Sequence, residues 1–133
     1  KVAPTGQSPS GTPLLILTFP ATENAYQARK SQNPEDWIRL QHVSPSDAKR
    51  LGRTFVLAPT WDVAERLRVM YAVNHLKYTQ NEDCRRALLA TGDALLAEGN
   101  AWGDTFWGVC KGRGENHLGR ILMRIRGEGA SLS

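Results

Sequence analysis

Residues 22–30 read TENAYQARK, a short segment that favours a helix. On a helix, Glu23, Tyr26 or Gln27, and Lys30 fall on one face, because they lie three, four and seven residues apart. A carboxylate, an aromatic ring and an amine on one side predict that this helix face lines a catalytic site. The alternative is an amphipathic surface helix whose charges are only solvated.

The composition is that of one ordinary globular domain. The chain has 133 residues, of which 41% are hydrophobic and 23% charged. Its longest apolar run, Leu14–Leu17, is much shorter than the roughly 18 residues that a membrane span requires. The net charge of +4 favours a phosphate-bearing partner but lacks the dense basic stripe of a general nucleic-acid binder. We therefore expect no membrane association.

Cysteine and histidine usage argues against a metal centre. Cys84 and Cys110 lie far apart and lack any ligand spacing, and the three histidines fall on different predicted elements. We predict no metal and no cofactor. Two isolated cysteines also suit a reducing compartment, so the expected location is the cytoplasm.

The patterning predicts a mainly helical α+β fold, with a few short strands, as a single domain over residues 14–133. Residues 1–13 are rich in Pro, Gly and Ser and are expected to form a flexible lead-in. Thr22 is expected to cap the first helix. Helices are expected to begin near Thr22, Asn33, Ser44, Trp61, Asn81 and Asn116, and strands are expected at 14–19 and 95–98.

Residues 102–108 read WGDTFWG, an aromatic loop around an acid. Loops rarely carry so much aromatic area unless they line a pocket, where an indole stacks on a base or a ribose. The alternative is a small satellite core beneath the loop.

Residues 112–120 read GRGENHLGR, and their glycines precede an expected helix. Backbone N–H groups at such a helix start favour an anion, and Arg113 could add a guanidinium fork to a phosphate. An ordinary turn is the alternative. No βαβ unit surrounds the segment, so it is not a dinucleotide-binding fingerprint.

Eight segments together form an ordered series. They are E-x-x-x-Q-x-x-K at 23–30, L-G-R at 51–53, Trp61, K-Y-T-Q-N at 77–81, L-L-A-T-G at 88–92, Glu98, D-T-F-W-G at 104–108 and N-H-L-G-R-I-L-M at 116–123. In this order and spacing the series resembles the NADAR (YbiA-like) family. The aromatic loop resembles the form common in a phage and bacterial subgroup. Asn24 stands where the family usually has His, and the family's Ser-Asn-Phe stretch is not recognisable in residues 1–16.

The resemblance implies an N-glycosidase that cleaves a bond between a base and a ribose. The implied partner is a ribosylated or ADP-ribosylated small molecule or nucleic-acid base, such as a riboflavin-pathway intermediate or ADP-ribosylated guanine. The expected catalytic residues are Glu23, Lys30 and Asp104, and the expected substrate-binding residues are Trp61, Trp102, Trp107, Gly108 and Asn116.

Two mechanisms remain open at this point. A carboxylate could stabilise an oxocarbenium-like transition state while an acid protonates the departing base. Alternatively, a desolvated Lys30 could attack C1′ and form a Schiff base. Two non-catalytic alternatives also remain, a sensor that binds ADP-ribose or a related nucleotide and a structural domain that keeps only the fold. Release of free base, read by chromatography, would separate an enzyme from a sensor.

Overall fold

The computed structural model describes residues 17–132, with the side chains of 17–129. This part of the chain forms six helices and two short strands, which confirms the prediction of a mainly helical α+β fold. It divides into two compact units, residues up to Gln80 and residues from Asn81, and each is described by itself. The predicted lead-in at 1–13 lies outside the described residues. Of the predicted strand at 14–19 only the last three residues are described, with a single isolated bridge position at Phe19.

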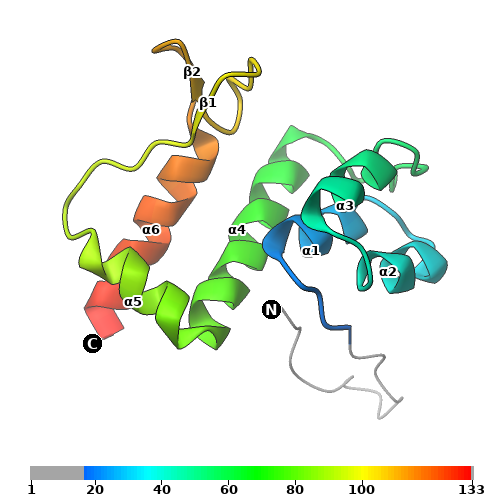
Figure 1. Ribbon diagram of the computed structural model, residues 1–133, viewed down its shortest axis with the longest axis horizontal. Helices are drawn as coiled ribbons and strands as arrows, with labels where there is room; N and C mark the ends of the chain where they lie inside the picture. The colour runs from blue at the N-terminus through cyan, green and yellow to red at the C-terminus, as the bar shows by residue number, and fades with distance from the viewer. Residues whose placement is uncertain (1–16, 133) are drawn as a thin grey trace. The chain divides into compact units, whose positions relative to one another are not determined.

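The first unit is built around a central helix of seven residues. Its elements are α1 (Thr22–Ala28), α2 (Pro34–Leu40), α3 (Pro45–Gly52) and α4 (Val63–Gln80). α1 packs against each of the other three (Figure 1). Residues 24–28 are all buried as a result. A helix of seven residues is marginal in isolation, so this packing rather than its own propensity stabilises α1.

Of the four helices of the first unit, α2 and α3 begin with the predicted capping residues, Asn33 and Ser44. The side chains of Asn33 and Ser44 accept backbone N–H groups at 3.0 and 3.2 Å, each followed by a proline in the first turn of the helix. The expected cap at Thr22 is wrong. Thr22 is itself helical, and the extended residue before the helix is Ala21, which has no side-chain oxygen to offer.

Asn24 fixes α1 to the turn that links α2 and α3. Its side chain is fully buried, and Nδ2 donates to the carbonyl oxygens of Leu40 at 2.9 Å and Val43 at 2.8 Å. These carbonyls lie at and just beyond the end of α2, where no intrahelical partner remains. The residue that departs from the family pattern is therefore a core hydrogen-bond donor in this chain.

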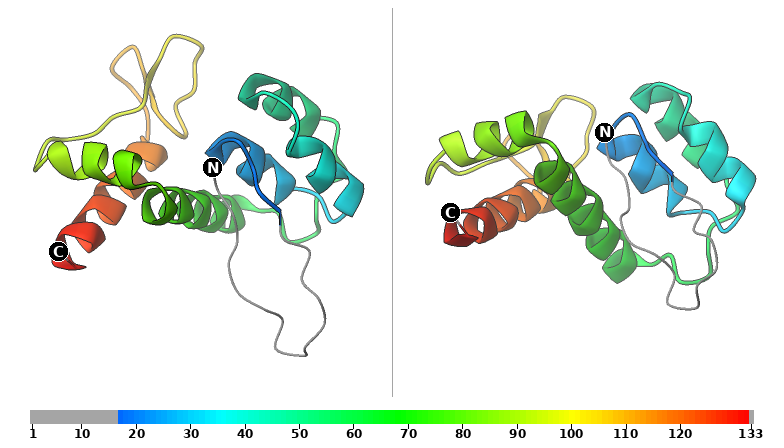
Figure 2. Two further views of the ribbon diagram at one scale, coloured as in Figure 1. Left: turned by 60° about the horizontal axis from the view of Figure 1, so that its bottom comes forward. Right: turned by 90° about the horizontal axis from the view of Figure 1, so that it is seen from below.

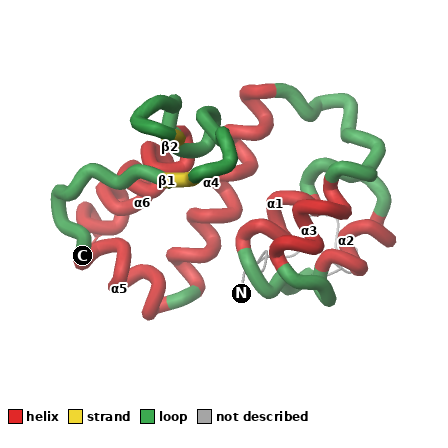
Figure 3. The backbone as a smooth tube through the Cα atoms, turned by 45° about the horizontal axis from the view of Figure 1, so that its top comes forward, coloured by secondary structure: helices red, strands yellow, loops and turns green. Residues whose placement is uncertain are grey.

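The second unit consists of two helices joined by a long loop that contains a small sheet. Its elements are α5 (Glu82–Ala90), β1 (Gly99–Asn100), β2 (Val109–Cys110) and α6 (His117–Leu132). α5 and α6 lie side by side (Figure 2), with Leu88, Ile121 and Ile125 buried. β1 and β2 form a parallel pair within the loop (Figure 3).

The strand expected at 95–98 is wrong. Leu95 is 90% exposed, and the two-residue strand β1 begins only after this segment. The Asn116 side chain holds the segment instead, by donating to the Leu96 carbonyl at 2.8 Å and accepting from the Glu98 N–H at 2.9 Å. Only Glu98, at the end of the segment, joins the β ladder, where its carbonyl accepts the Val109 N–H at 2.7 Å.

No helix within residues 17–132 is both long enough and apolar enough to cross a membrane.

Candidate active site

The predicted carboxylate and amine of the first unit lie close together. Lys30 follows the end of α1, and its backbone N–H still donates to the Gln27 carbonyl at 3.1 Å, so Lys30 continues the helical face. The Lys30 ammonium lies 5.5 Å from the centre of the Tyr26 ring. On the same face, Gln27 Nε2 donates to Glu23 Oε1 at 3.3 Å. Glu23, Tyr26, Gln27 and Lys30 thus form one contiguous group.

Trp61 and Arg66 join this group from the start of α4. The Trp61 ring meets the Tyr26 ring edge-on, with 5.5 Å between centroids. Arg66 hydrogen-bonds the Tyr26 side chain. Trp61, which was predicted to stack on the substrate, lies at the edge of this group, beside Tyr26. Arg66 was not predicted, because only the packing of α4 on α1 brings it to Tyr26.

The local environment perturbs two ionisable groups. Burial is the main cause that lowers the pKa of the Lys30 amine from its ordinary value; the Glu23 carboxylate opposes this effect, and nearby cations add to it. Burial also raises the pKa of the Tyr26 phenol, against the hydrogen bond and charge of Arg66. An amine that releases its proton more readily is better suited to nucleophilic attack.

The last turn of α3 packs closely against α1 at Gly52. A Cβ atom at Gly52 would lie 1.9 Å from Oε1 of Gln27, so a larger residue at this position would require the Gln27 side chain to move. Gln27 Oε1 is buried and has no hydrogen-bond partner within residues 17–132. The contact places Lys49 and Arg53, at the end of α3, where their charges act on Lys30.

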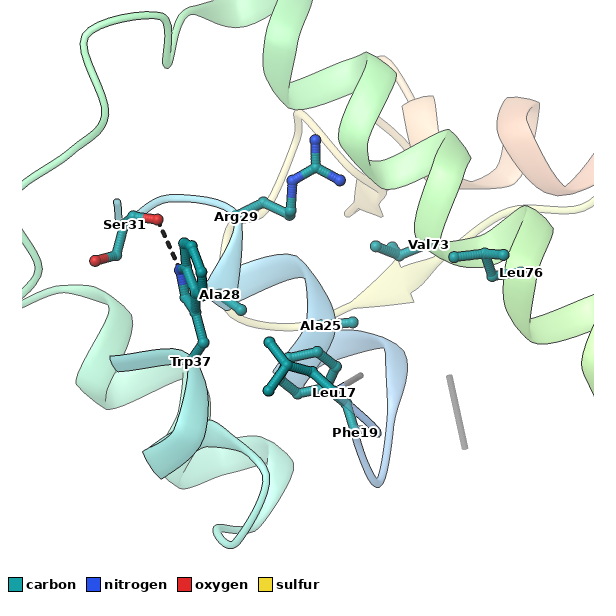
Figure 4. Close-up of a pocket in the computed structure, with 9 residues that line it drawn as sticks. All are labelled: Leu17, Phe19, Ala25, Ala28, Arg29, Ser31, Trp37, Val73 and Leu76. Carbon is teal, nitrogen blue, oxygen red and sulfur yellow. Dashed lines mark hydrogen bonds between the residues drawn. The ribbon is translucent and has the colours of Figure 1, made fainter. Parts of the chain in front are cut away.

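A separate apolar cavity of about 260 Å³ lies on the other side of α1. Ala25 and Ala28 contribute to it from the helix face opposite Glu23, and Arg29 is the one ionisable side chain within residues 17–129 that lines it (Figure 4). Trp37 borders it and donates its indole N–H to the Ser31 carbonyl at 2.8 Å. None of the predicted site residues lines this cavity, and it lacks a carboxylate for glycosidic chemistry.

In the second unit, Asp104 organises the aromatic loop. Its Oδ1 accepts the backbone N–H groups of Phe106 at 3.1 Å and Trp107 at 2.9 Å. Asn100 exchanges two further hydrogen bonds with the Asp104 backbone, at 2.8 and 2.9 Å. Within residues 17–132 no hydrogen bond reaches Asp104 Oδ2. The carboxylate thus has a structural role through one oxygen, while the other oxygen remains for a ligand.

The two tryptophans of the loop have different surroundings. Trp102 is 68% exposed. Trp107 is half-buried and meets the Phe106 ring edge-on at 4.8 Å, while Phe106 lies 4.7 Å from His117. The alternative of a small satellite cluster therefore describes part of the environment of Trp107.

Gly108 and Asn116 are both required by the backbone around them. A Cβ at Gly108 would lie 2.1 Å from the Glu98 carbonyl oxygen. Asn116 has a positive φ of 55°, which suits its residue type at a turn. Both predicted binding residues have a structural explanation, and their predicted contact with substrate stays a prediction.

The expected anion site at the start of α6 is wrong. The backbone N–H groups of residues 115–118 donate to the carbonyls of Thr105, Gly108, Phe106 and Trp107, at 2.7 to 3.3 Å. The aromatic loop folds back over the helix start and occupies these donors. A phosphate would have to displace four hydrogen bonds to bind there.

Comparison with known proteins agrees with the resemblance found in the sequence. A family model described as the NADAR domain matches residues 5–128. The chain is 37% identical over 128 residues to N-glycosidase Npun_R5314 of Nostoc punctiforme, covering 91% of this chain and 81% of that protein. It is 34% identical over 113 residues to N-glycosidase YbiA of Escherichia coli, covering 82% of this chain and 69% of YbiA.

A solved structure and a plant protein extend the comparison. The NMR structure of the E. coli protein YbiA superposes with a TM-score of 0.77 at 32% identity, covering 87% of this chain and 70% of YbiA. The chain is also 33% identical over 126 residues to the chloroplastic riboflavin biosynthesis protein PYRR of Zea mays. That match covers 84% of this chain but only 20% of the plant protein.

These relatives establish the general class of reaction, glycosyl hydrolysis of the N-glycosidase type. The family model spans nearly the whole chain, and two N-glycosidases are more than 30% identical to it over most of their lengths. This chain belongs to the NADAR domain family.

Proposed function

We propose that the chain hydrolyses the bond between a nitrogenous base and C1′ of a ribose, which can carry phosphate or be part of ADP-ribose. The observation that supports this most is the Lys30 amine, held 5.5 Å from the Tyr26 ring beside Glu23. The named relatives, which include N-glycosidases and a riboflavin biosynthesis protein, agree with a ribosylated base as substrate. We also propose that the protein is located in the cytoplasm.

In the proposed reaction, Lys30 acts as nucleophile in its unprotonated form. Its Nζ attacks C1′ as the C1′–N bond breaks, and the departing base takes a proton. Opening of the sugar ring then gives a protonated Schiff base between C1′ and Nζ. Water adds to this carbon, releases the sugar and restores the amine.

Glu23 is proposed to stabilise positive charge at C1′ in the transition state. A carboxylate next to a developing oxocarbenium ion acts where charge appears, so its effect is on kcat more than on binding. If Lys30 does not attack, Glu23 serves the same purpose during direct attack by water. The proposal of base cleavage holds under either route.

In the second unit, taken separately, Asp104 and the aromatic loop residues are the groups proposed to contact substrate. Asp104 Oδ2 is the candidate to protonate the base or orient water, while Oδ1 holds the loop. Trp107 is the main candidate to stack on the base, with Trp61 and Trp102 as further stacking residues. Gly108 and Asn116 are proposed to shape the loop against the substrate.

A substrate panel tests the function directly. The full chain is incubated with a ribosylated riboflavin-pathway intermediate and with ADP-ribosylated guanine oligonucleotides, and free base is measured by chromatography. We expect base release from at least one substrate and its loss in Glu23→Gln, with binding retained. Binding of all substrates without any base release would overturn the proposal in favour of a nucleotide sensor.

A further inference from the structure

The side chain of Asn100 holds the aromatic loop of the second unit at Asp104. Asn100 belongs to β1, where it pairs in parallel register with Cys110 of β2. Its Oδ1 accepts the Asp104 N–H at 2.9 Å, and its Nδ2 donates to the Asp104 carbonyl at 2.8 Å. One amide thus binds both main-chain polar groups of the same residue, which fixes the position and the direction of the Asp104 backbone.

The Asn100 amide is itself held by two further acceptors. Its Nδ2 donates to Oε2 of Glu98 at 3.3 Å and to the carbonyl oxygen of Val109 at 3.4 Å. Glycine at position 108 leaves room for these groups, since a Cβ atom there would overlap Glu98 Oε2 and lie 3.0 Å from Asn100 Nδ2. Asn100 is half-buried, which strengthens its hydrogen bonds relative to those of an exposed amide. The Asn100 side chain is therefore fixed in one orientation.

Asp104 in turn holds the backbone of Trp107. Its Oδ1 accepts the N–H groups of Phe106 and Trp107, and within residues 17–132 no hydrogen bond reaches its Oδ2. Asn100 fixes the backbone of Asp104, and the two N–H groups fix one of its carboxylate oxygens. Together these contacts determine the direction in which Oδ2 points. Without the Asn100 amide the Asp104 backbone would lose two partners, and the carboxylate would move with it.

We propose that Asn100 is a positioning residue for the glycosidase reaction, which acts through Asp104 by keeping its Oδ2 and the backbone of Trp107 in the orientation that the substrate requires. The inference rests on the proposed function, in which Asp104 Oδ2 protonates the base or orients water. Asparagine suits this role because its amide places a donor beside an acceptor, matching the N–H and the carbonyl of one residue. Misplacing a reacting group by about 1 Å can lower a rate about a hundredfold.

Hydrogen exchange followed by NMR tests the arrangement without catalysis. In the full chain the N–H groups of Asp104, Phe106 and Trp107 should exchange slowly, because each has a side-chain acceptor. Asn100→Ala should make exchange at all three positions about tenfold faster or more. Asn100→Asp is the milder variant, because it keeps the side-chain shape and the acceptor but loses the donor, and exchange at Phe106 and Trp107 should again be faster.

Thr91→Val is the matched control for a general loss of stability in the second unit. The Thr91 hydroxyl donates to the Leu88 carbonyl at 2.6 Å and accepts from Arg126 Nη1 at 2.9 Å, at the end of α5 and outside the aromatic loop. Removing this hydroxyl should leave exchange within the loop and kcat unchanged. Similar effects of Thr91→Val and Asn100→Ala on the loop would overturn the positioning role.

A double-mutant cycle tests whether Asn100 acts through Asp104. Asn100→Ala should lower kcat for base release about ten- to hundredfold and change KM by less than about threefold. Asp104→Asn keeps the oxygen that accepts the two N–H groups but removes the carboxylate, so it should lower kcat as well. Adding Asn100→Ala to Asp104→Asn should then lower kcat no further, whereas a residue with only a structural role would lower it in both backgrounds.

The outcomes separate this inference from the function on which it rests. An unchanged kcat in Asn100→Ala or Asp104→Asn, or an equal further loss in the double variant, would overturn the positioning role and leave the glycosidase function intact. Unchanged exchange at Phe106 and Trp107 in Asn100→Ala would overturn it as well. Faster exchange there, in a chain that releases base from no substrate, would keep Asn100 as the residue that orients the loop and reject the glycosidase.

Discussion

Lys30 shows how one residue acquires a chemical property that its sequence position does not reveal. A lysine after a short helix is usually solvated and protonated. Here burial against Tyr26 and the neighbouring cations lower its pKa, and Glu23 limits the effect. Burial therefore sets the direction of the shift in the Lys30 pKa, and the balance between one acid and several cations modulates it.

Two substitutions should move the pKa of Lys30 in opposite directions. Glu23→Gln removes the charge that favours the ammonium form, so the pKa should fall further. Lys49→Gln removes a repelling cation, so the pKa should rise toward the ordinary 10.5. Titration of ¹³C-lysine-labelled protein by NMR measures both, with Arg50→Gln as the unshifted control. Shifts in the same direction would contradict this account of the electrostatics.

Borohydride should trap Lys30 if the Schiff-base route operates. Reduction of the imine during turnover gives a stable secondary amine, so mass spectrometry should find a sugar adduct on the peptide that contains Lys30. Trapping should increase with pH and level off below pH 10.5, since the pKa of Lys30 is lowered and only the unprotonated amine attacks. Lys30→Arg should abolish adduct and activity together, because guanidinium stays protonated. An active Lys30→Arg enzyme would leave direct hydrolysis as the mechanism.

At the scale of elements, α1 is a core helix that presents a chemical face on one side and an apolar face on the other. Asn24 and Gly52 make this position possible, the first by bonding the end of α2 and the second by admitting α3. The proposed site therefore depends on packing residues that never touch the substrate.

Asn24→Ala should destabilise the first unit by about 2–4 kcal/mol, because it leaves two carbonyls without their donor. Asn33→Ala is a matched control, since it removes an exposed helix cap that contributes only about 1 kcal/mol. Urea denaturation of both variants gives the comparison. Equal losses of stability would show that the Asn24 hydrogen bonds contribute no more than an exposed cap.

Gly52→Ala should also disturb the first unit, because its Cβ would overlap Gln27 Oε1. We expect a loss of about 1–3 kcal/mol in the free energy of unfolding. Gly127→Ala is the control, since nothing lies within 4 Å of its added Cβ. Unchanged stability in Gly52→Ala would mean that Gln27 adjusts freely.

At the scale of the whole molecule, the excess of basic residues should appear as a dependence on salt. The net charge of +4 attracts a phosphorylated substrate, and ions screen that attraction over about 10 Å at 0.1 M. KM should therefore rise with ionic strength while kcat changes little. An unphosphorylated ribosyl substrate serves as the control and should show no such rise; identical salt dependence for both substrates would contradict a role of charge in binding.

The helical fold class, the helix starts at Asn33 and Ser44, and the family could all be predicted from the sequence. These depend on local signals, such as caps, prolines and motif order, which act within a few residues. The spacing of Glu23, Tyr26 and Lys30 predicted that they share one face, and Lys30 does lie over the Tyr26 ring, although α1 ends at Ala28. Tertiary structure decided the burial of Asn24, the cations around Lys30 and the occupied donors at the start of α6. Each of these depends on segments distant in sequence, and no local pattern specifies which of them come into contact.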